Sequence, residues 1–247
     1  MAHSRTRSRQ VPAVYIAGTV IGGQGSGMEY LRWIPGCVLL LATGVAGPAV
    51  AGAGAGDWQP EAHGWEFVRK VDRIGLYRKP VTGSPFPALL AHTRMPVPAA
   101  DVYRVISDYD HFAEFVPAVS MSRVLERSAT HTRVYQRLDL PMLFTDRHYI
   151  IQVTDRFDAT NGLTRVNWQL AANQSRALPP GTAVLPKVFS GFWRLTDTPD
   201  GSGCEALYSI HVDPGGRLPA WLFTRAAKRY ITDVVTAVRQ RAMRITE

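Results

Sequence analysis

The residues of this 247-residue chain that could hold a metal ion or act as nucleophiles are its seven histidines and two cysteines. No two histidines stand four positions apart with an acid between them, the spacing that puts two metal ligands on one helix face. Cys204 is the only cysteine after residue 50, which excludes a multi-cysteine metal site and an internal disulfide from that part. We therefore predict no metal and no cofactor.

Asp146, Arg147 and His148 form a local cluster that could perform acid–base chemistry. Side chains alternate between the two faces of a strand, so His148 should lie on the face opposite Tyr149. We interpret Asp146 and Arg147 as an ion pair at the start of a strand, and Asp213 as the cap of a turn or of a helix end. No catalytic residue is predicted, and we do not expect an enzyme.

The first elements that position these residues are two extended segments and two helices. Residues 65–79 and 86–97 have the composition of strands joined by a connection. Pro98 suits the first turn of a helix, and Pro117 ends a second, shorter one. The aromatic stripe of that second helix, which includes Tyr109 and Phe112, is typical of core packing.

Six strand-like runs and a long amphipathic helix at 219–245 follow. Asn161-Gly162 and Asp200-Gly201 are strong hairpin turns, so the strands should pair antiparallel. This order predicts an α+β fold in which a curved antiparallel sheet wraps around a long C-terminal helix, with two short helices after the second strand. Alternation in the later strands predicts one dry face, formed by Tyr149, Ile151, Val153, Val166, Trp168, Leu170, Tyr208, Ile210 and Val212.

The N-terminal region resembles an export signal. From Met28 it offers a short n-region, an apolar run and small residues up to Ala51, as at a signal-peptide cleavage site. We predict an upstream extension at 1–27, a signal peptide at 28–51 and one domain at 58–247, located in the periplasm or secreted. The alternative is an uncleaved anchor, because the uncharged stretch around the signal is long enough to span a membrane.

The charge of the remaining chain is moderately basic. Residues 1–50 hold four of the 28 basic and one of the 20 acidic residues, which leaves 24 against 19, a net charge of +5. This balance suits an anionic membrane surface or a nucleic acid. The arginines are scattered over strands and are not interleaved with exposed aromatics, which disfavours nucleic acid.

Several short motifs resemble the START-like, or SRPBCC, superfamily of helix-grip proteins. They are Trp65 with "GLYRK" at 75–79, the pair Asp146-Arg147, "GFWRL" at 191–195 and "DPGGRLPAWL" at 213–222. The string "DYDHFAEFVPAVSMSRVLE" at 108–126 is similar instead to coenzyme Q-binding and polyketide cyclase members. The resemblance covers about residues 58–247 and implies an apolar tunnel between the sheet and the last helix.

The resemblance implies a ligand cavity built from the dry face together with Leu222 and Phe223. The helix and its adjoining loops would act as a lid, with a hinge formed by Asp213, Pro214, Gly215, Gly216, Pro219 and Trp221. Some START proteins bury an arginine at the position of Val153, so the resemblance does not imply a polar anchor of the sterol type here. A largely apolar ligand would be oriented by other groups, such as Tyr149, Trp168 or Tyr208.

We therefore expect an exported, monomeric carrier that binds one lipid or other hydrophobic molecule and transiently contacts a membrane surface. Two alternatives stay open: an enzyme of the polyketide cyclase/aromatase type, and a quinone-binding chaperone of the coenzyme Q-binding type. The sequence does not identify the ligand, which could be a lipid, a quinone or a sterol-like molecule.

Overall fold

The fold is organised around one antiparallel sheet, seen in a computed structural model that describes residues 58–140, 144–174, 178, 183–216 and 218–246. The expected extension and signal peptide lie outside these residues. The sheet of the described chain has nine strands in the order β1-β2-β3-β9-β8-β7-β6-β5-β4. Their bounds are β1 (Glu66–Val71), β2 (Ile74–Lys79), β3 (Ala88–Met95), β4 (Val119–Arg127), β5 (Thr132–Leu138), β6 (Arg147–Asp158), β7 (Leu163–Leu170), β8 (Val188–Asp197) and β9 (Cys204–Asp213).

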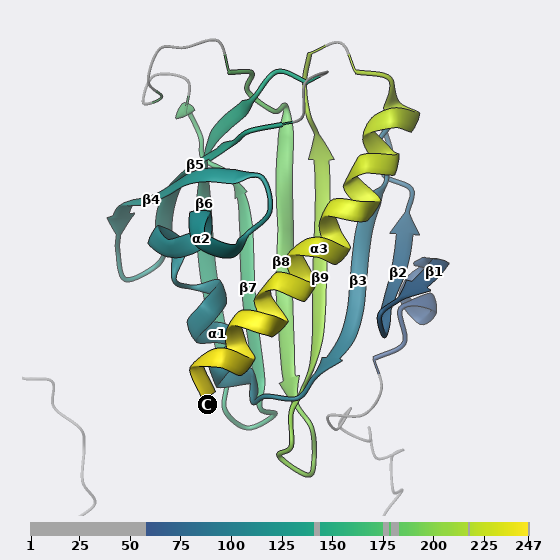
Figure 1. Cartoon of the computed structure of the whole chain (residues 1–247), viewed down its shortest axis with the longest axis vertical. Coiled ribbons are helices and arrows are strands. Elements are labelled where there is room, and N and C mark those ends of the chain that lie inside the picture. The colour runs from purple at the N-terminus through teal and green to yellow at the C-terminus, as the bar shows by residue number, and fades with distance from the viewer. Residues whose placement is uncertain (1–57, 141–143, 175–177, 179–182, 217, 247) are drawn as a thin grey trace, which may run out of the picture. The chain divides into compact units, whose positions relative to one another are not determined.

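The long helix α3 (Ala220–Thr246) runs diagonally across one face of this curved sheet (Figure 1). Its buried residues recur at spacings of three and four, which places them on one stripe. These residues are Ala227, Ile231, Thr232, Val234, Val235, Val238 and Ala242. Burial of this stripe against the apolar face of the sheet forms the main core of the domain.

Short helices complete the cover on the side of β4. They are α1 (Ala99–Ile106), η2 (Tyr109–His111) and α2 (Phe112–Phe115), while a further turn, η1 (Glu61–His63), precedes β1. Helix α1 packs on α3, and η2 and α2 pack on β4. Two polar contacts tie α3 to these helices, since Thr246 Oγ1 donates to Asp101 at 3.2 Å and Arg241 to Glu114 at 3.1 Å.

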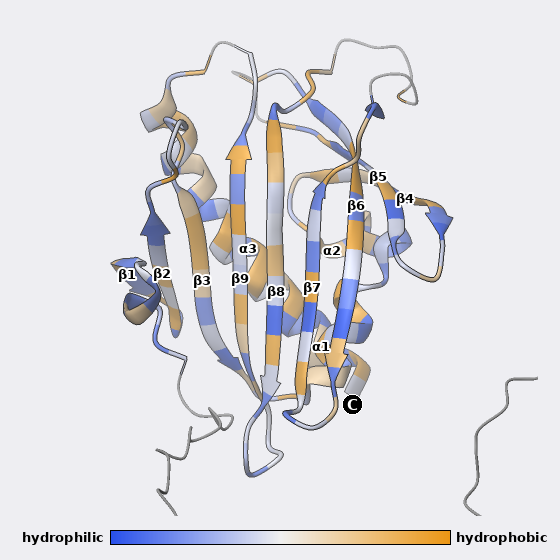
Figure 2. Cartoon of the chain, turned by 180° about the vertical axis from the view of Figure 1, so that it is seen from behind, coloured by the Kyte–Doolittle hydropathy of each residue, from blue (hydrophilic) through white to orange (hydrophobic). Residues whose placement is uncertain are grey.

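Polar and apolar residues alternate along the strands (Figure 2), and because successive side chains point to opposite faces, the face away from α3 receives most of the polar ones. Two small buried clusters interrupt its polar character. Trp65, Leu90 and Leu207 form one, and Tyr135, Ile150 and Ala171 form the other. The described residues include no helix that is both long and apolar enough to cross a membrane.

The predicted fold class is confirmed: this is an α+β fold with a curved antiparallel sheet around a long C-terminal helix. One detail differs, because residues 65–79 form two strands rather than one. The chain reverses at Asp72 and Arg73, which both have positive φ, 47° and 66°. Neither residue is glycine, so the sequence lacked the usual Asn-Gly signal for such a turn. Because of this additional strand, the short helices follow the third strand and not the second.

Candidate functional site

A cavity of about 60 Å³ lies between the sheet and α3. Its walls come from α1, η2, α2, β4 to β9 and α3. Six side chains of the predicted dry face line it, namely Tyr149, Ile151, Val153, Val166, Trp168 and Tyr208. The strand register brings them together, since Val153 pairs with Trp168 and Trp168 with Gly191 across β6, β7 and β8.

The other predicted cavity residues lie elsewhere. Ile210, Val212 and Phe223 line a second hollow of about 10 Å³, where the rings of Phe223 and Phe86 meet edge to face at 5.3 Å. Leu170 is half-buried against the core, and Leu222 is half-buried in the first turn of α3; neither lines these two hollows. That a ligand occupies the larger cavity stays a prediction.

Several lining residues were not predicted as part of a site. Some come from the helical segments interpreted as core, some from the middle of α3, and some from flanking strands. They are Ile106, Tyr109, Phe112, Val116, Val119, Gln136, Phe189, Trp193, Tyr230, Val234 and Val238. The apolar stripe of α3 was visible in the sequence, but the point at which the helix crosses the strands was not.

Trp168 is held in one orientation at the centre of the cavity wall. Its ring stacks on Tyr208 at 5.7 Å, and Tyr208 stacks on Trp193 at 4.4 Å. Gly191 lies opposite Trp168 on the neighbouring strand β8. A Cβ added there would lie 2.4 Å from Cζ2 of Trp168 and 2.1 Å from the carbonyl oxygen of Ser209. Glycine in the "GFWRL" motif therefore makes room for the indole ring.

Four tyrosines line the cavity, Tyr109, Tyr149, Tyr208 and Tyr230, and three of them lie on β6, β9 and α3. Burial raises the pKa of Tyr149 and Tyr208 well above their usual value of 10.0, and the nearby phenol of Tyr230 raises both further. Burial alone raises the pKa of Tyr230. These hydroxyls are therefore uncharged donors and acceptors at neutral pH.

Two buried polar atoms of the described residues have no hydrogen-bond partner: the hydroxyl of Tyr109 and Nε1 of Trp168. Both residues line the same cavity. A buried polar group without a partner is uncommon in native structures and calls for an explanation.

The turn before α3 is held by a buried arginine. Arg147, only 6% exposed, donates from Nε to the carbonyl oxygen of Pro214 at 2.8 Å and from Nη2 to that of Gly215 at 3.4 Å. Its Nη1 donates to the carbonyl oxygen of Thr145. The expected ion pair with Asp146 is wrong, because Asp146 pairs with Arg137 at 2.8 Å.

The residues predicted as a hinge lie between β9 and the first turn of α3. The backbone N–H of Gly215 donates to Asp213 Oδ1 at 3.0 Å, which confirms Asp213 as a turn cap. Gly215 and Gly216 have φ of 65° and 70°, a region that favours glycine. Pro219 accepts the first backbone bonds of α3 from Leu222 and Phe223. Trp221 is 70% exposed and lines neither of the two hollows, and its place at the cavity mouth stays a prediction.

The polar groups considered for catalysis lie outside the cavity. His148 is on the face opposite Tyr149, as expected, but it is buried, and this burial lowers its pKa. His211 contacts Ser84 Oγ at 3.1 Å. Burial raises the pKa of Cys204 to about 12, which keeps it a thiol. No group of three or more His, Cys, Asp or Glu side chains that could hold a metal occurs among the described residues.

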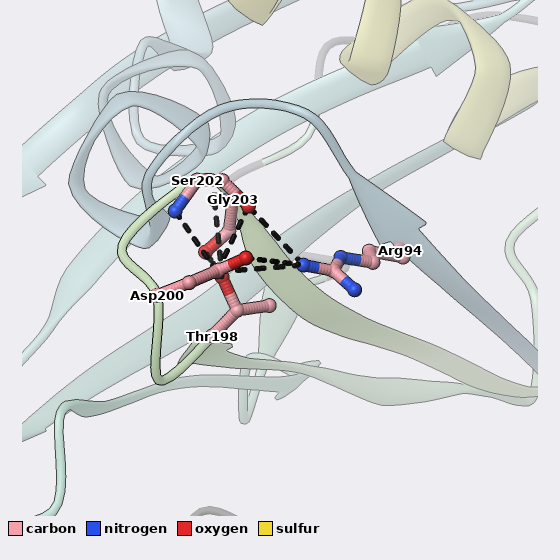
Figure 3. Close-up of polar contacts among 5 residues, drawn as sticks. All are labelled: Arg94, Thr198, Asp200, Ser202 and Gly203. Atoms are coloured by element: carbon pink, nitrogen blue, oxygen red, sulfur yellow. Dashed lines mark hydrogen bonds and ion pairs between the residues drawn. The ribbon is translucent and has the colours of Figure 1, made fainter.

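A dense polar cluster between β8 and β9 is a turn-stabilising network (Figure 3). Asp200 accepts from Thr198 Oγ1 at 2.6 Å and from the backbone and side chain of Ser202 at 3.1 and 2.8 Å. Arg94 adds a longer contact at 3.4 Å. Hydrogen bonds from Thr198 and Ser202 lower the pKa of Asp200, so the carboxylate is ionised and engaged within the turn.

Comparison with known proteins agrees with this geometry. Residues 95–239 match the model of a family described as polyketide cyclase / dehydrase and lipid transport. An uncharacterized protein of Pseudomonas aeruginosa is 26% identical over 164 residues, covering 65% of this chain and 78% of that protein.

Two solved structures share the fold. The STAR-related lipid transfer protein from Xanthomonas axonopodis is 24% identical with a TM-score of 0.64, over 73% of this chain and 99% of that one. Human StAR-related lipid transfer protein 5 is 13% identical with a TM-score of 0.66, over 74% of this chain and 88% of that one.

Proposed function

Because the chain belongs to the polyketide cyclase / dehydrase and lipid transport family, we propose that it binds a hydrophobic molecule between the sheet and α3 and carries it to or from a membrane. The observation that carries this proposal is the cavity itself. Aromatic and aliphatic side chains dominate its lining, with the Gln136 amide, the tyrosine hydroxyls and the indole N–H groups as its polar atoms. Such a lining is typical of small-molecule sites.

The chemistry of this lining supports a carrier over a cyclase-type enzyme. No Asp, Glu, Lys, Arg or His belongs to the described residues that line the cavity. General acid–base catalysis works best with a group whose pKa is near the operating pH. The buried tyrosines instead have raised pKa values and stay protonated. A cyclase would have to act through shape and neutral hydrogen bonds alone.

The size of the cavity means that the proposed function requires a moving lid. Ligand sites usually enclose about 300–1,000 Å³, whereas this cavity measures about 60 Å³. A lipid-sized molecule can enter only if α3 moves away from the sheet or the lining side chains rearrange. The turn at 213–216, with its two glycines and the bonds from Arg147, is a suitable pivot for α3.

Surface features near this turn support docking at an anionic membrane. Trp221 projects into solvent at the start of α3, and tryptophan favours the membrane interface. Arg225 and Arg229 are exposed on the following turns, and exposed Lys187 bonds through its backbone to Asp213. Each basic side chain near an anionic surface contributes about 1 kcal/mol of attraction.

We also propose that the carrier acts outside the cytoplasm, which the signal-like residues 28–51 support. N-terminal sequencing of the protein recovered from the native periplasm or medium tests this. A mature end near residue 51 is expected, and a protein that retains residues 1–50 in the cytoplasm would contradict export.

The central experiment is native mass spectrometry of the protein purified from its native compartment, followed by lipid extraction and a transfer assay. We expect one hydrophobic molecule per protein and accelerated transfer of that molecule between vesicles. Product formation from a bound precursor would instead favour the cyclase function. A protein that carries no hydrophobic molecule and transfers none would reject the proposal.

A further inference from the structure

The two unpaired donors carry information about the ligand. Tyr109 and Trp168 are 4% and 9% exposed, and their hydroxyl and Nε1 face no hydrogen-bond acceptor among the described residues. They come from distant parts of the chain, η2 and β7, yet line one cavity. Because an unpaired buried donor is costly to a folded protein, this convergence indicates an acceptor that the described residues do not supply.

Neither donor can readily find a partner by turning. The Trp168 indole is fixed between the stack on Tyr208 and the backbone at Gly191. The Tyr109 ring packs on Phe112 at 5.3 Å. The carboxylate of Asp155 is close enough to raise the pKa of Tyr109, but it accepts its hydrogen bond from Tyr103, at 2.8 Å.

The acceptor must be uncharged. No cationic side chain is among the described residues that line the cavity, so a carboxylate or phosphate placed there would be a buried charge without a counter-ion. A carbonyl-type oxygen, by contrast, has two lone pairs and satisfies neutral O–H and N–H donors. A pure hydrocarbon has no acceptor and would leave both donors unpaired.

We propose that the ligand is an uncharged lipid-like carbonyl compound whose oxygen accepts hydrogen bonds from Tyr109 and Trp168. The inference rests on the proposed function and adds the chemical class of the ligand. The hydrocarbon part fills the space that opens as α3 moves, and the two donors fix the position of the oxygen. A flexible ketone or ester and a planar quinone share this acceptor chemistry.

Three probes delivered from cyclodextrin test the class: a long-chain methyl ketone, the n-alkane with the same number of carbons, and an alkyl naphthoquinone. We expect wild-type protein to bind the ketone or the quinone, or both, at least tenfold more tightly than the alkane. The preferred carbonyl probe identifies the flexible or the planar source. In addition, the indole N–H resonance of Trp168, assigned from its loss in Trp168→Phe, should shift downfield with that probe and not with the alkane.

Tyr109→Phe and Trp168→Phe each remove one donor and keep an aromatic ring, although both also alter the cavity wall. The readout is therefore the ratio of carbonyl affinity to alkane affinity, which should fall about tenfold in each variant. Tyr135→Phe, on the opposite face of the sheet, is the matched control and should bind all probes as wild type does. Tyr109→Phe should unfold at the same or a higher temperature, because it deletes an unpaired hydroxyl; if it unfolds earlier, the Trp168 resonance of wild-type protein decides.

The outcomes separate this inference from the proposed function. Equal affinity for the ketone, the quinone and the alkane, or an unshifted Trp168 resonance in the carbonyl complex, would overturn the inference and leave hydrophobic binding intact. A parallel loss of alkane binding in Tyr109→Phe would show that the ring acts by shape and would also overturn it. Failure of all three probes to bind would reject the proposed function and this inference with it.

Discussion

Replacing Arg147 by methionine should loosen the turn that connects the sheet to α3. The guanidinium donates hydrogen bonds to the carbonyl oxygens of Pro214 and Gly215 at 2.8 and 3.4 Å. These bonds connect the start of β6 to the turn. Methionine keeps much of the apolar stem and removes these bonds. The substitution therefore tests whether a side chain from the sheet holds the pivot of the proposed lid.

The expected cost follows from two opposing effects. A hydrogen bond from a charged donor contributes about 1.5–3 kcal/mol, and the bond at 3.4 Å should contribute less because it is long. Methionine also removes the desolvation cost of a buried guanidinium, which opposes the loss. We expect the free energy of unfolding to fall by about 2 kcal/mol, within the usual range for a broken buried network.

Urea unfolding and hydrogen exchange measured by mass spectrometry provide the assay. The first turns of α3 should exchange faster in Arg147→Met, while the middle of the sheet changes little, and a bound hydrophobic ligand should exchange faster between vesicles. Arg137→Met is the matched control, because Arg137 is half-exposed and pairs with Asp139 and Asp146 at the surface. Such pairs contribute about 0–1 kcal/mol.

Two results would refute this reasoning. Unchanged stability and unchanged exchange of α3 in Arg147→Met would mean that the arginine does not hold the turn. An equal loss in Arg137→Met would mean that the effect comes from the change in net charge and not from the bonds to Pro214 and Gly215.

Three further predictions concern other parts of the molecule. Gly191→Ala should lower the free energy of unfolding by about 1–3 kcal/mol or more in urea titrations, because the new Cβ meets Ser209 and Trp168; an unchanged transition midpoint would contradict the tight fit. Trp221→Ser should weaken binding to anionic vesicles in sedimentation assays without changing stability, whereas Phe157→Ser, a large exposed ring at the far end of β6, should bind normally; equal losses would argue against docking through the start of α3. Hydrogen bonds lower the pKa of Asp200 below its ordinary 3.8, so its contribution to stability is present above about pH 4 and is lost as the pH falls further; Asp200→Asn should reduce the acid sensitivity of unfolding, and an identical pH profile would contradict this role.

The wall of the cavity was predictable because a strand repeats every two residues. Alternation alone placed Tyr149, Val153 and Trp168 on one face, and the antiparallel register then brought them side by side. The helical contribution was less accessible. Tyr109 belongs to an aromatic stripe that looked like core, and nothing in a helical pattern distinguishes a ring that touches a cavity from one that touches another ring.

Long-range contacts account for the other differences. Arg147 stands beside Asp146 in sequence, yet its partners are carbonyl groups near residue 214, and only the folded chain brings that turn to the start of β6. Leu222 and Phe223 were expected at the cavity because they begin α3. The helix crosses the sheet diagonally, so its middle, at Tyr230 and Val234, meets the cavity instead.

The pairing of β3 with β9 has a consequence for how the protein forms. Leu89 pairs with Ile210 and Met95 with Cys204, so β3, near the start of the domain, can complete its pairing only after β9, near the end, has been synthesised. Contacts of such large sequence separation slow folding, since a long loop is closed before they form. The runs β1 to β3 and β4 to β8 pair only with their neighbours in sequence, so they can form early. The pairing of β3 with β9 and the core beneath α3 cannot be completed on a ribosome that has not yet released the C-terminal segment. The chain should therefore acquire its cavity in a late, cooperative step.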